Sequence, residues 1–284
     1  MATARAGLAA VPDSLAQVGK LARYQLREYL RSRRFLALVA IIGAIGAILT
    51  GLLGYYRPSA LLGGSLAFYS DLWGGVTVVI VLAAVFFGGD AIAGEFQNKT
   101  GYFLMGLPVR RTTVYVGKFL AAFLASVAMV LLFLAIVVGN GVFYLRAAAL
   151  PWQLGVSLVL AIVYLAAVLG ATFLFSSLFK TSAYGFVLTA ILFLFGFTIL
   201  QELVTDLVGI EPWMVISYAA STITNVFGSG VNWGLAGQSS TVTEFRTTTT
   251  TWTAGIAEGV VIMIAYLVVT AAVGLWRFER EEFT

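Results

Sequence analysis

Six long runs of apolar residues divide this chain, and its charged residues lie almost entirely between those runs. An α-helix rises about 1.5 Å per residue, so about 20 apolar residues cross the roughly 30 Å hydrocarbon core of a bilayer. The predicted spans are 35–56, 70–90, 118–145, 152–178, 183–203 and 254–276. Backbone groups in lipid must pair internally, and the sequence lacks the ten-residue alternation of a membrane β-barrel. We therefore predict an all-α integral membrane protein, built as a bundle of six transmembrane helices.

The composition agrees with this fold class and removes most chemistry. Only 11% of the 284 residues are charged and 60% are hydrophobic, whereas about a quarter of the residues in a soluble domain are charged. The chain has no His and no Cys, which excludes disulfides, thiol nucleophiles, Cys/His metal sites and His general bases. The patterns GxxxxGK(S/T), HExxH and GxSxG are absent too. We predict that the chain is not an enzyme and has no catalytic residue, metal or cofactor of its own, although a metal site built only from acids stays open.

The basic residues define the two sides of the bundle. Fourteen of the seventeen Lys and Arg residues lie in segments 1–34, 90–118, around 180 and 277–284, and three lie on the opposite side. The positive-inside rule makes the first set cytoplasmic, with both termini there. We expect a multi-pass protein of the plasma membrane. Because the basic residues end apolar runs instead of forming a face, no nucleic-acid partner is expected.

An amphipathic helix is predicted at 15–34, within a cytoplasmic segment 1–34 that precedes the membrane domain 35–284. Apolar residues recur at helical spacing, and basic residues line much of the remaining surface. We predict that this elbow helix lies in the membrane interface and directs Arg23, Arg27, Arg31 and Arg34 toward lipid headgroups. Two roles stay open: a topology anchor alone, or an elbow that also touches a cytoplasmic partner.

The loop 90–118 is the most informative cytoplasmic segment. A short helix is predicted at about 91–98, with Asp90 as its N-cap and Glu95 in its first two turns. The mixture of acid, amide, apolar and basic groups suits docking to a protein surface, whereas the alternative is a solvated loop. The turn around Lys180 is either a second contact or a tight helical hairpin.

One long extracellular loop, 204–253, separates the fifth and sixth spans. A short extracellular helix is predicted to begin at Glu211-Pro212-Trp213 and to end near Phe227, since Pro is tolerated at the first helical position. Residues 228–253 are rich in Gly, Ser and Thr and predict an exposed polar loop. Whether this loop is a lid, is passive, is modified or binds a partner stays open.

Acidic residues inside the spans are few. Glu258 lies about one turn into the last span, where a carboxylate costs less than at the membrane centre. We therefore predict that Glu258 is a snorkelling or hydrogen-bonded acid and not a proton carrier. No chain of acids for a proton relay is visible in the sequence.

The loop after the second span resembles that of ABC transporter permeases of the type-2 exporter class. The matching residues are Gly89-Asp90, Ile92, Glu95, Lys99-Thr100-Gly101, Leu107-Pro108-Val109-Arg110-Arg111 and Gly117-Lys118. The order Thr100-Gly101 is the reverse of the common one, which leaves the helix register open. The short turn after Phe175-Ser176-Ser177-Leu178-Phe179 is similar to the family's junction between spans four and five.

The resemblance implies a permease without its own motor. Two copies, or this chain and a paralogue, would pair with two ATP-binding subunits that hold ATP and Mg²⁺. The helix 91–98 would be the coupling helix in a cleft of the ATPase, where Glu95 and Gln97 meet the motor and Arg110 and Arg111 orient the next helix. The coupling interface implied in this way consists of Asp90, Ile92, Glu95, Phe96, Gln97, Arg110 and Arg111, with Lys180 as the second contact.

Two other functions stay open at this stage. A secondary transporter or channel would work without an ATPase, but inverted repeats or buried charge relays are not clear in the sequence. An intramembrane enzyme would need chemistry that the composition largely removes. The transported substrate and its binding residues are unknown from the sequence, and export is favoured over import only by the resemblance.

Overall fold

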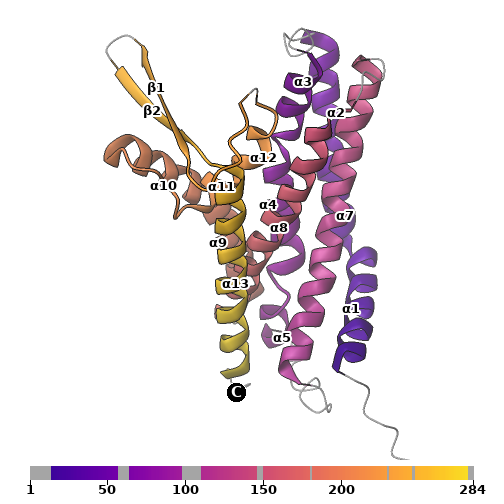
Figure 1. Ribbon diagram of the computed structural model, residues 1–284. Coiled ribbons are helices and arrows are strands. Elements are labelled where there is room, and N and C mark those ends of the chain that lie inside the picture. The colour runs from indigo at the N-terminus through magenta and orange to yellow at the C-terminus, as the bar shows by residue number, and fades with distance from the viewer. Residues whose placement is uncertain are drawn as a thin grey trace, which may run out of the picture.

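The computed structural model describes residues 14–56, 64–97, 110–145, 150–179, 181–228, 230–244 and 247–280 (Figure 1). The α-helices are α1 (Ser14–Arg31), α2 (Arg33–Tyr56), α3 (Gly64–Trp73), α4 (Val76–Gly88), α5 (Ala93–Gln97), α7 (Arg111–Leu145), α8 (Trp152–Leu178), α9 (Ser182–Ile191), α10 (Phe197–Leu203), α11 (Ile216–Ala220), α12 (Thr222–Asn225) and α13 (Ile256–Arg280). Two π-helical segments, η2 (Leu192–Gly196) and η3 (Val204–Val208), follow α9 and α10. Two strands, β1 (Gln238–Glu244) and β2 (Thr247–Thr253), precede α13.

Six helical stretches in the described part of the chain are long and apolar enough to cross a membrane, which confirms the predicted bundle. The stretches are Arg33–Tyr55, Gly64–Glu95, Arg111–Leu145, Trp152–Leu178, Ser182–Asp206 and Ile256–Arg280. The third is longer than predicted, because α7 begins at Arg111 and its 35 residues extend about 50 Å. Its first turns therefore lie beyond a single bilayer core.

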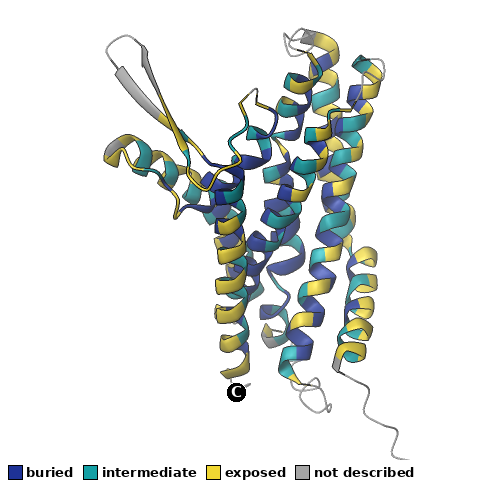
Figure 2. Cartoon of the chain, in the orientation of Figure 1, coloured by how far each residue is buried: buried dark blue, intermediate teal, exposed yellow. Residues whose placement is uncertain are grey.

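The centre of the bundle is α4, which packs against α2, α7, α8 and α9. Its sequence VTVVIVLAAVFFG is apolar on every side, as expected for a helix surrounded by protein. Figure 2 shows this buried core and the exposed outer faces of α13 and α7. Polar contacts also fix the core, because the indole nitrogen of Trp73 donates to Ser157 Oγ at 2.8 Å and Ser157 Oγ donates to the carbonyl of Ile223.

The amino-terminal helix differs from the elbow predicted at 15–34. It ends at Arg31, and Arg34 belongs to α2. Figure 1 shows α1 running beside the first part of α7 instead of across the bundle, and Ala22 and Tyr29 are buried there. Gly117 of α7 permits this approach, because a Cβ at that position would collide with Leu21. The apolar face of α1 is thus directed to α7.

The fifth span bends away from the bundle along its length. α9, η2, α10 and η3 form one continuous helical stretch that ends at Gly209, whose φ of +68° gives a left-handed helix end. In Figure 1 the α10 part leans outward from the other helices. No residue of α10 is buried.

The long loop contains structure that the sequence prediction missed. Within the predicted exposed polar loop, β1 and β2 pair antiparallel with Gln238 opposite Thr253 and Glu244 opposite Thr247. Thr is β-branched and favours strands, which explains why a Thr-rich segment forms a ladder. The predicted helix at Pro212 begins only at Ile216 and is divided into α11 and α12.

We call one end of the bundle the hairpin end, because it carries β1, β2, α11 and α12. The opposite end carries α5, the start of α7 and the end of α13, and we call it the α5 end (Figure 1). α1 begins and α13 ends at the α5 end (Figure 1).

Candidate functional site

The short helix predicted in the loop after the second span is present as α5, at one end of the bundle. Two turns at 89–92 lead into it, with hydrogen bonds from Gly94 N to Asp90 O (2.8 Å) and from Glu95 N to Ile92 O (3.0 Å). A helix of five residues is far too short to be stable alone, so its position depends on contacts with the rest of the chain.

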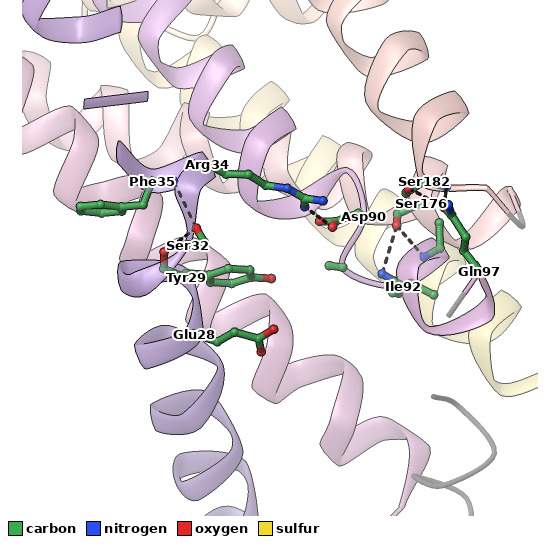
Figure 3. Close-up of polar contacts among 12 residues, drawn as sticks. Glu28, Tyr29, Ser32, Arg34, Phe35, Asp90, Ile92, Gln97, Ser176 and Ser182 are labelled. Atoms are coloured by element: carbon green, nitrogen blue, oxygen red, sulfur yellow. Dashed lines mark hydrogen bonds and ion pairs between the residues drawn. The ribbon is translucent and has the colours of Figure 1, made fainter. Parts of the chain in front are cut away.

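The start of α5 is capped by a residue of α8. Ser176 Oγ accepts hydrogen bonds from Ile92 N at 3.1 Å and from Ala93 N at 3.0 Å (Figure 3). Ser176 is fully buried, so these amides have exchanged water for the serine hydroxyl. The prediction that Asp90 is the N-cap is therefore wrong, because the side chain of Asp90 pairs with Arg34 instead.

A buried lysine of α7 holds the middle of α5. Lys118 Nζ donates to the carbonyl of Ala91 at 2.8 Å and forms an ion pair with Glu95. The Lys118 side chain is only 9% exposed and that of Glu95 is 19% exposed. A cation with so little water depends on these oxygen partners, so the pair strongly favours one position of α5 relative to α7.

The end of α5 is tied to the start of α9. Gln97 Oε1 accepts hydrogen bonds from Ser182 N at 3.1 Å and Ser182 Oγ at 2.7 Å (Figure 3). α9 also approaches the end of α4 and α8 closely at Gly185, where a Cβ would lie 2.9 Å from the carbonyl oxygen of Gly89. A side chain at position 185 would therefore force these helices apart.

A second ion pair connects the α5 loop to α2. Arg34 pairs with Asp90 (Figure 3), while the nearby hydroxyl of Ser32 accepts from Phe35 N at 3.2 Å and marks the break between α1 and α2. Tyr29 packs against Phe87 with ring centroids 5.4 Å apart. Burial, and next the charge of Asp90, raise the pKa of Tyr29, so its phenol stays protonated.

The predicted interface residues lie at this end in different environments. Asp90, Glu95 and Gln97 are tied to other helices as described above, and Ile92 is buried. Arg110 is exposed, whereas Arg111 Nη1 donates to the carbonyl of Glu279 at 2.7 Å and connects α7 to α13. Lys180 and the side chain of Phe96 lie outside the described residues. Arg23, Arg27 and Arg31 are exposed on α1.

Three residues at this site were missed as site residues by the sequence prediction: Lys118, Ser176 and Ser182. Gly117-Lys118 and Phe175-Ser176 were recognised only as parts of a motif. Their partners lie 23 and 84 positions away along the chain, so no local pattern indicates the contacts. In the described part of the chain, no group of three or more acids is placed to hold a metal ion.

The acids at the hairpin end have structural contacts. Glu258 Oε2 accepts from Gly255 N at 3.1 Å, so it is hydrogen-bonded, as one of the two predictions for it stated. Glu211 Oε1 accepts from Tyr218 Oη at 2.6 Å and from Gly237 N at 2.8 Å, which joins α11 to the base of the hairpin. Burial and this hydrogen bond raise the pKa of Tyr218.

Comparison with known proteins supports a transport role. A family model described as ABC-2 family transporter protein matches residues 20–283, which is nearly the whole chain. A search of curated proteins finds none that matches. The match includes α5, its contacts in α2, α7, α8 and α9, and all six spans.

Proposed function

Because the chain belongs to the ABC-2 family of transporter proteins and is a multi-pass membrane permease, we propose that it is the transmembrane subunit of an ATP-driven exporter. The family implies association with an ABC ATP-binding subunit. The proposal adds that two such subunits hold ATP and Mg²⁺ and drive two permease chains, identical or paralogous. The permease itself contributes helices, docking surfaces and a path for cargo.

The observation that carries this proposal is the fixation of α5 by three spans. Lys118 of α7, Ser176 of α8 and Ser182 of α9 all bond to α5 or to the residues just before it. A force applied to α5 from outside therefore reaches several helices at once. Coupling of this kind needs a bundle with two packings of similar stability, which the ATPase biases.

The proposed interface places direct and indirect roles on different residues. Gln97 and Arg110 are exposed at the α5 end, where a partner can reach them. Glu95 and Asp90 have an indirect role, because their ion pairs with Lys118 and Arg34 transmit movement of α5 to α7 and α2. The α5 end faces the cytoplasm in this proposal, in the plasma membrane, as the distribution of basic residues predicts.

The test uses the complete chain expressed with its ATP-binding subunit. Since the chain has no cysteine, the substitution Ile199→Cys gives one attachment point for a polarity-sensitive fluorophore on exposed α10. We expect ATP to change its emission only when the ATPase is present. Glu95→Arg places a cation against Lys118 and should abolish the ATP-dependent change while assembly is retained.

The matched control is Glu279→Arg, which makes the same charge change at an exposed position of the α5 end. It should leave the ATP-dependent signal intact. An unchanged response in Glu95→Arg would contradict coupling through α5. Cargo movement by the chain alone, driven by an ion gradient in liposomes, would instead favour a secondary transporter or channel.

A further inference from the structure

A groove of about 310 Å³ opens on the hairpin-end half of the bundle. It lies between α4, α8, the η2–α10 part of the fifth span and the short helices α11 and α12, and we name it the α4–α10 groove. Its walls include Val78 and Val81 of α4 and Tyr164 of α8, all inside stretches long enough to span a membrane. No lining residue of the groove belongs to α5 or to the contacts described around it.

The lining has two chemically distinct parts. One part is apolar and includes Val81, Phe193 and Leu194. The other carries hydroxyl and amide groups, among them Gln201 and Ser217. No charged side chain lines this groove among the described residues. A charged ligand would lose water there without gaining a partner charge, so the lining favours a neutral molecule that has a polar and an apolar part.

Two polar groups in the groove can donate a hydrogen bond to a ligand. Tyr164 lines the groove and is only 3% exposed, and its hydroxyl is not among the fully enclosed polar atoms that lack a partner in the described part of the chain. Gln201 accepts a hydrogen bond on Oε1 from Ser217 Oγ at 2.7 Å, while its amide nitrogen has no acceptor in the described part of the chain. A phenol hydroxyl and an amide nitrogen both donate hydrogen bonds, so a bound molecule with hydroxyl or carbonyl oxygens can accept from both.

The groove is open toward the surroundings of the bundle. Val78 is 44% exposed and Thr198 is also exposed, and both belong to membrane-spanning stretches. Phe193 and Leu194 come from the π-helical segment η2, a geometry that is often found at functional sites. An entrance at this depth admits molecules from the lipid phase.

We propose that the α4–α10 groove binds a neutral amphipathic lipid, with its hydroxyl or ester oxygens at Tyr164 and Gln201 and its chains along Val81 and Phe193. The proposal that this lipid is the transported cargo rests on the proposed function. The proposal that the groove binds the lipid does not depend on α5 or on the ATPase.

The test is photolabelling of the complete chain in lipid nanodiscs, without ATP or ATPase. The probe is a photoactivatable, alkyne-tagged diacylglycerol, and the comparison probe is a phosphatidylserine with the same chains. Peptides that contain residues 76–81 and 193–201 should be labelled more strongly by the neutral probe than the exposed face of α13 at Val268. The anionic probe should not show this preference.

Variants with matched controls locate the site. Val78→Trp closes the entrance and should abolish the preferential labelling, whereas Val116→Trp on α7, at a side chain of nearly equal exposure (45% against 44%), should not. Tyr164→Phe should weaken binding about 2- to 10-fold, the value of one hydrogen bond. Tyr184→Phe, at an exposed tyrosine of α9, should leave binding unchanged.

Equal labelling of groove and α13 peptides, or equal loss in Val78→Trp and Val116→Trp, would overturn the proposed site. Equal labelling by both probes would overturn the neutral ligand class. Because no ATPase is present in this experiment, its failure leaves the coupling result untouched. A failed coupling test with positive labelling would likewise leave a lipid site in a protein with another function.

Discussion

The α5 end and the α4–α10 groove differ in how firmly their helices are held. At the α5 end, ion pairs and capping hydrogen bonds from three spans converge on a helix of five residues. Around the groove, α10 has no buried residue, two π-helical segments interrupt the fifth span, and the amide nitrogen of Gln201 has no acceptor among the described residues. The first region suits transmission of a force, and the second suits rearrangement around a ligand.

The physical basis of this difference is the cost of leaving a polar group unpaired. A buried lysine that loses its oxygens is penalised strongly, so the α5 end has few alternative arrangements. An exposed helix with π-helical turns can shift register at small cost. Changes at the two regions should therefore differ in magnitude, and the following substitutions test that order.

Lys118→Met should produce the largest loss. The substitution keeps the length of the side chain but removes the donor to Ala91 and the partner of Glu95. We expect the free energy of unfolding to fall by about 3 kcal/mol, as for other broken buried pairs. The decrease in thermal unfolding midpoint in detergent measures this effect, and ATP-dependent signals should be lost with it.

A double-mutant cycle separates the ion pair from simple packing loss. Glu95→Gln alone and combined with Lys118→Met gives the coupling energy between the two side chains. The double variant should be less destabilised than the sum of the single variants, because no charge is then left unpaired. Additive effects would show that the ion pair does not fix α5. The α5 end would then not be held more firmly than the groove by this pair.

Ser176→Ala tests the cap of α5 and should have the next largest effect. The loss of hydrogen bonds to Ile92 N and Ala93 N should cost about 1–2 kcal/mol. Hydrogen exchange of the amides in 92–97 should become faster than in the unsubstituted chain. Ser177→Ala is the control, since Ser177 Oγ donates only within α8, to the carbonyl of Leu174, and its substitution should leave α5 protected.

The two regions differ in how many of their structural features the sequence predicts. The six spans follow from uninterrupted apolar runs, which are local features, and the short helix after the second span follows from its flanking glycines and charges. The contact of Arg34 with Asp90 joins residues 56 positions apart, and no local pattern indicates which cation meets which acid. Asp90 fits the N-cap pattern, but the amides at the start of α5 donate to the buried hydroxyl of Ser176.

The hairpin and the groove show a second limit of sequence reasoning. Residues 247–253 have a composition that suits either an exposed loop or a strand, and only pairing with 238–244 decides between them. The groove is lined in part by η2 and α10, and a π-helical segment has no sequence signature within an apolar run. Tyr164 is one of several aromatic residues in the apolar spans, and only the folded structure shows that it lines the groove.

One tyrosine at each end of the bundle should limit the stability of the fold at alkaline pH. Tyr29 at the α5 end and Tyr218 at the hairpin end both have a pKa raised by burial, and both lie outside the spans. Below pH about 10, tyrosines are protonated in both the folded and the unfolded chain. Above it, the unfolded chain loses the proton first, so the free energy of unfolding should fall by about 1.4 kcal/mol per pH unit for each tyrosine.

Tyr29→Phe and Tyr218→Phe should each reduce this slope between pH 10 and 11.5, measured by chemical unfolding at constant ionic strength. Tyr24→Phe, at an exposed side chain of α1, is the control and should keep the original slope. Tyr218→Phe should also lose about 1 kcal/mol at pH 7, because the hydrogen bond to Glu211 is removed. If Tyr29→Phe leaves the dependence of the free energy of unfolding on pH unchanged, water reaches this phenol in the folded chain. The α5 end would then be less tightly packed than its contacts indicate.

Thr251→Ala on β2 should have the smallest effect. Thr251 Oγ1 and Ser240 Oγ are 2.8 Å apart across the hairpin, but both side chains are exposed and water can replace either hydroxyl. The thermal midpoint should change by the equivalent of at most about 0.5 kcal/mol. Ser157→Ala removes the same kind of group in the core, where Ser157 accepts from Trp73 and donates to Ile223, and should cost about 1–3 kcal/mol. If the two variants cost the same, the Thr251 hydroxyl is not replaced by water, and the hairpin is then covered by another chain in the assembled protein.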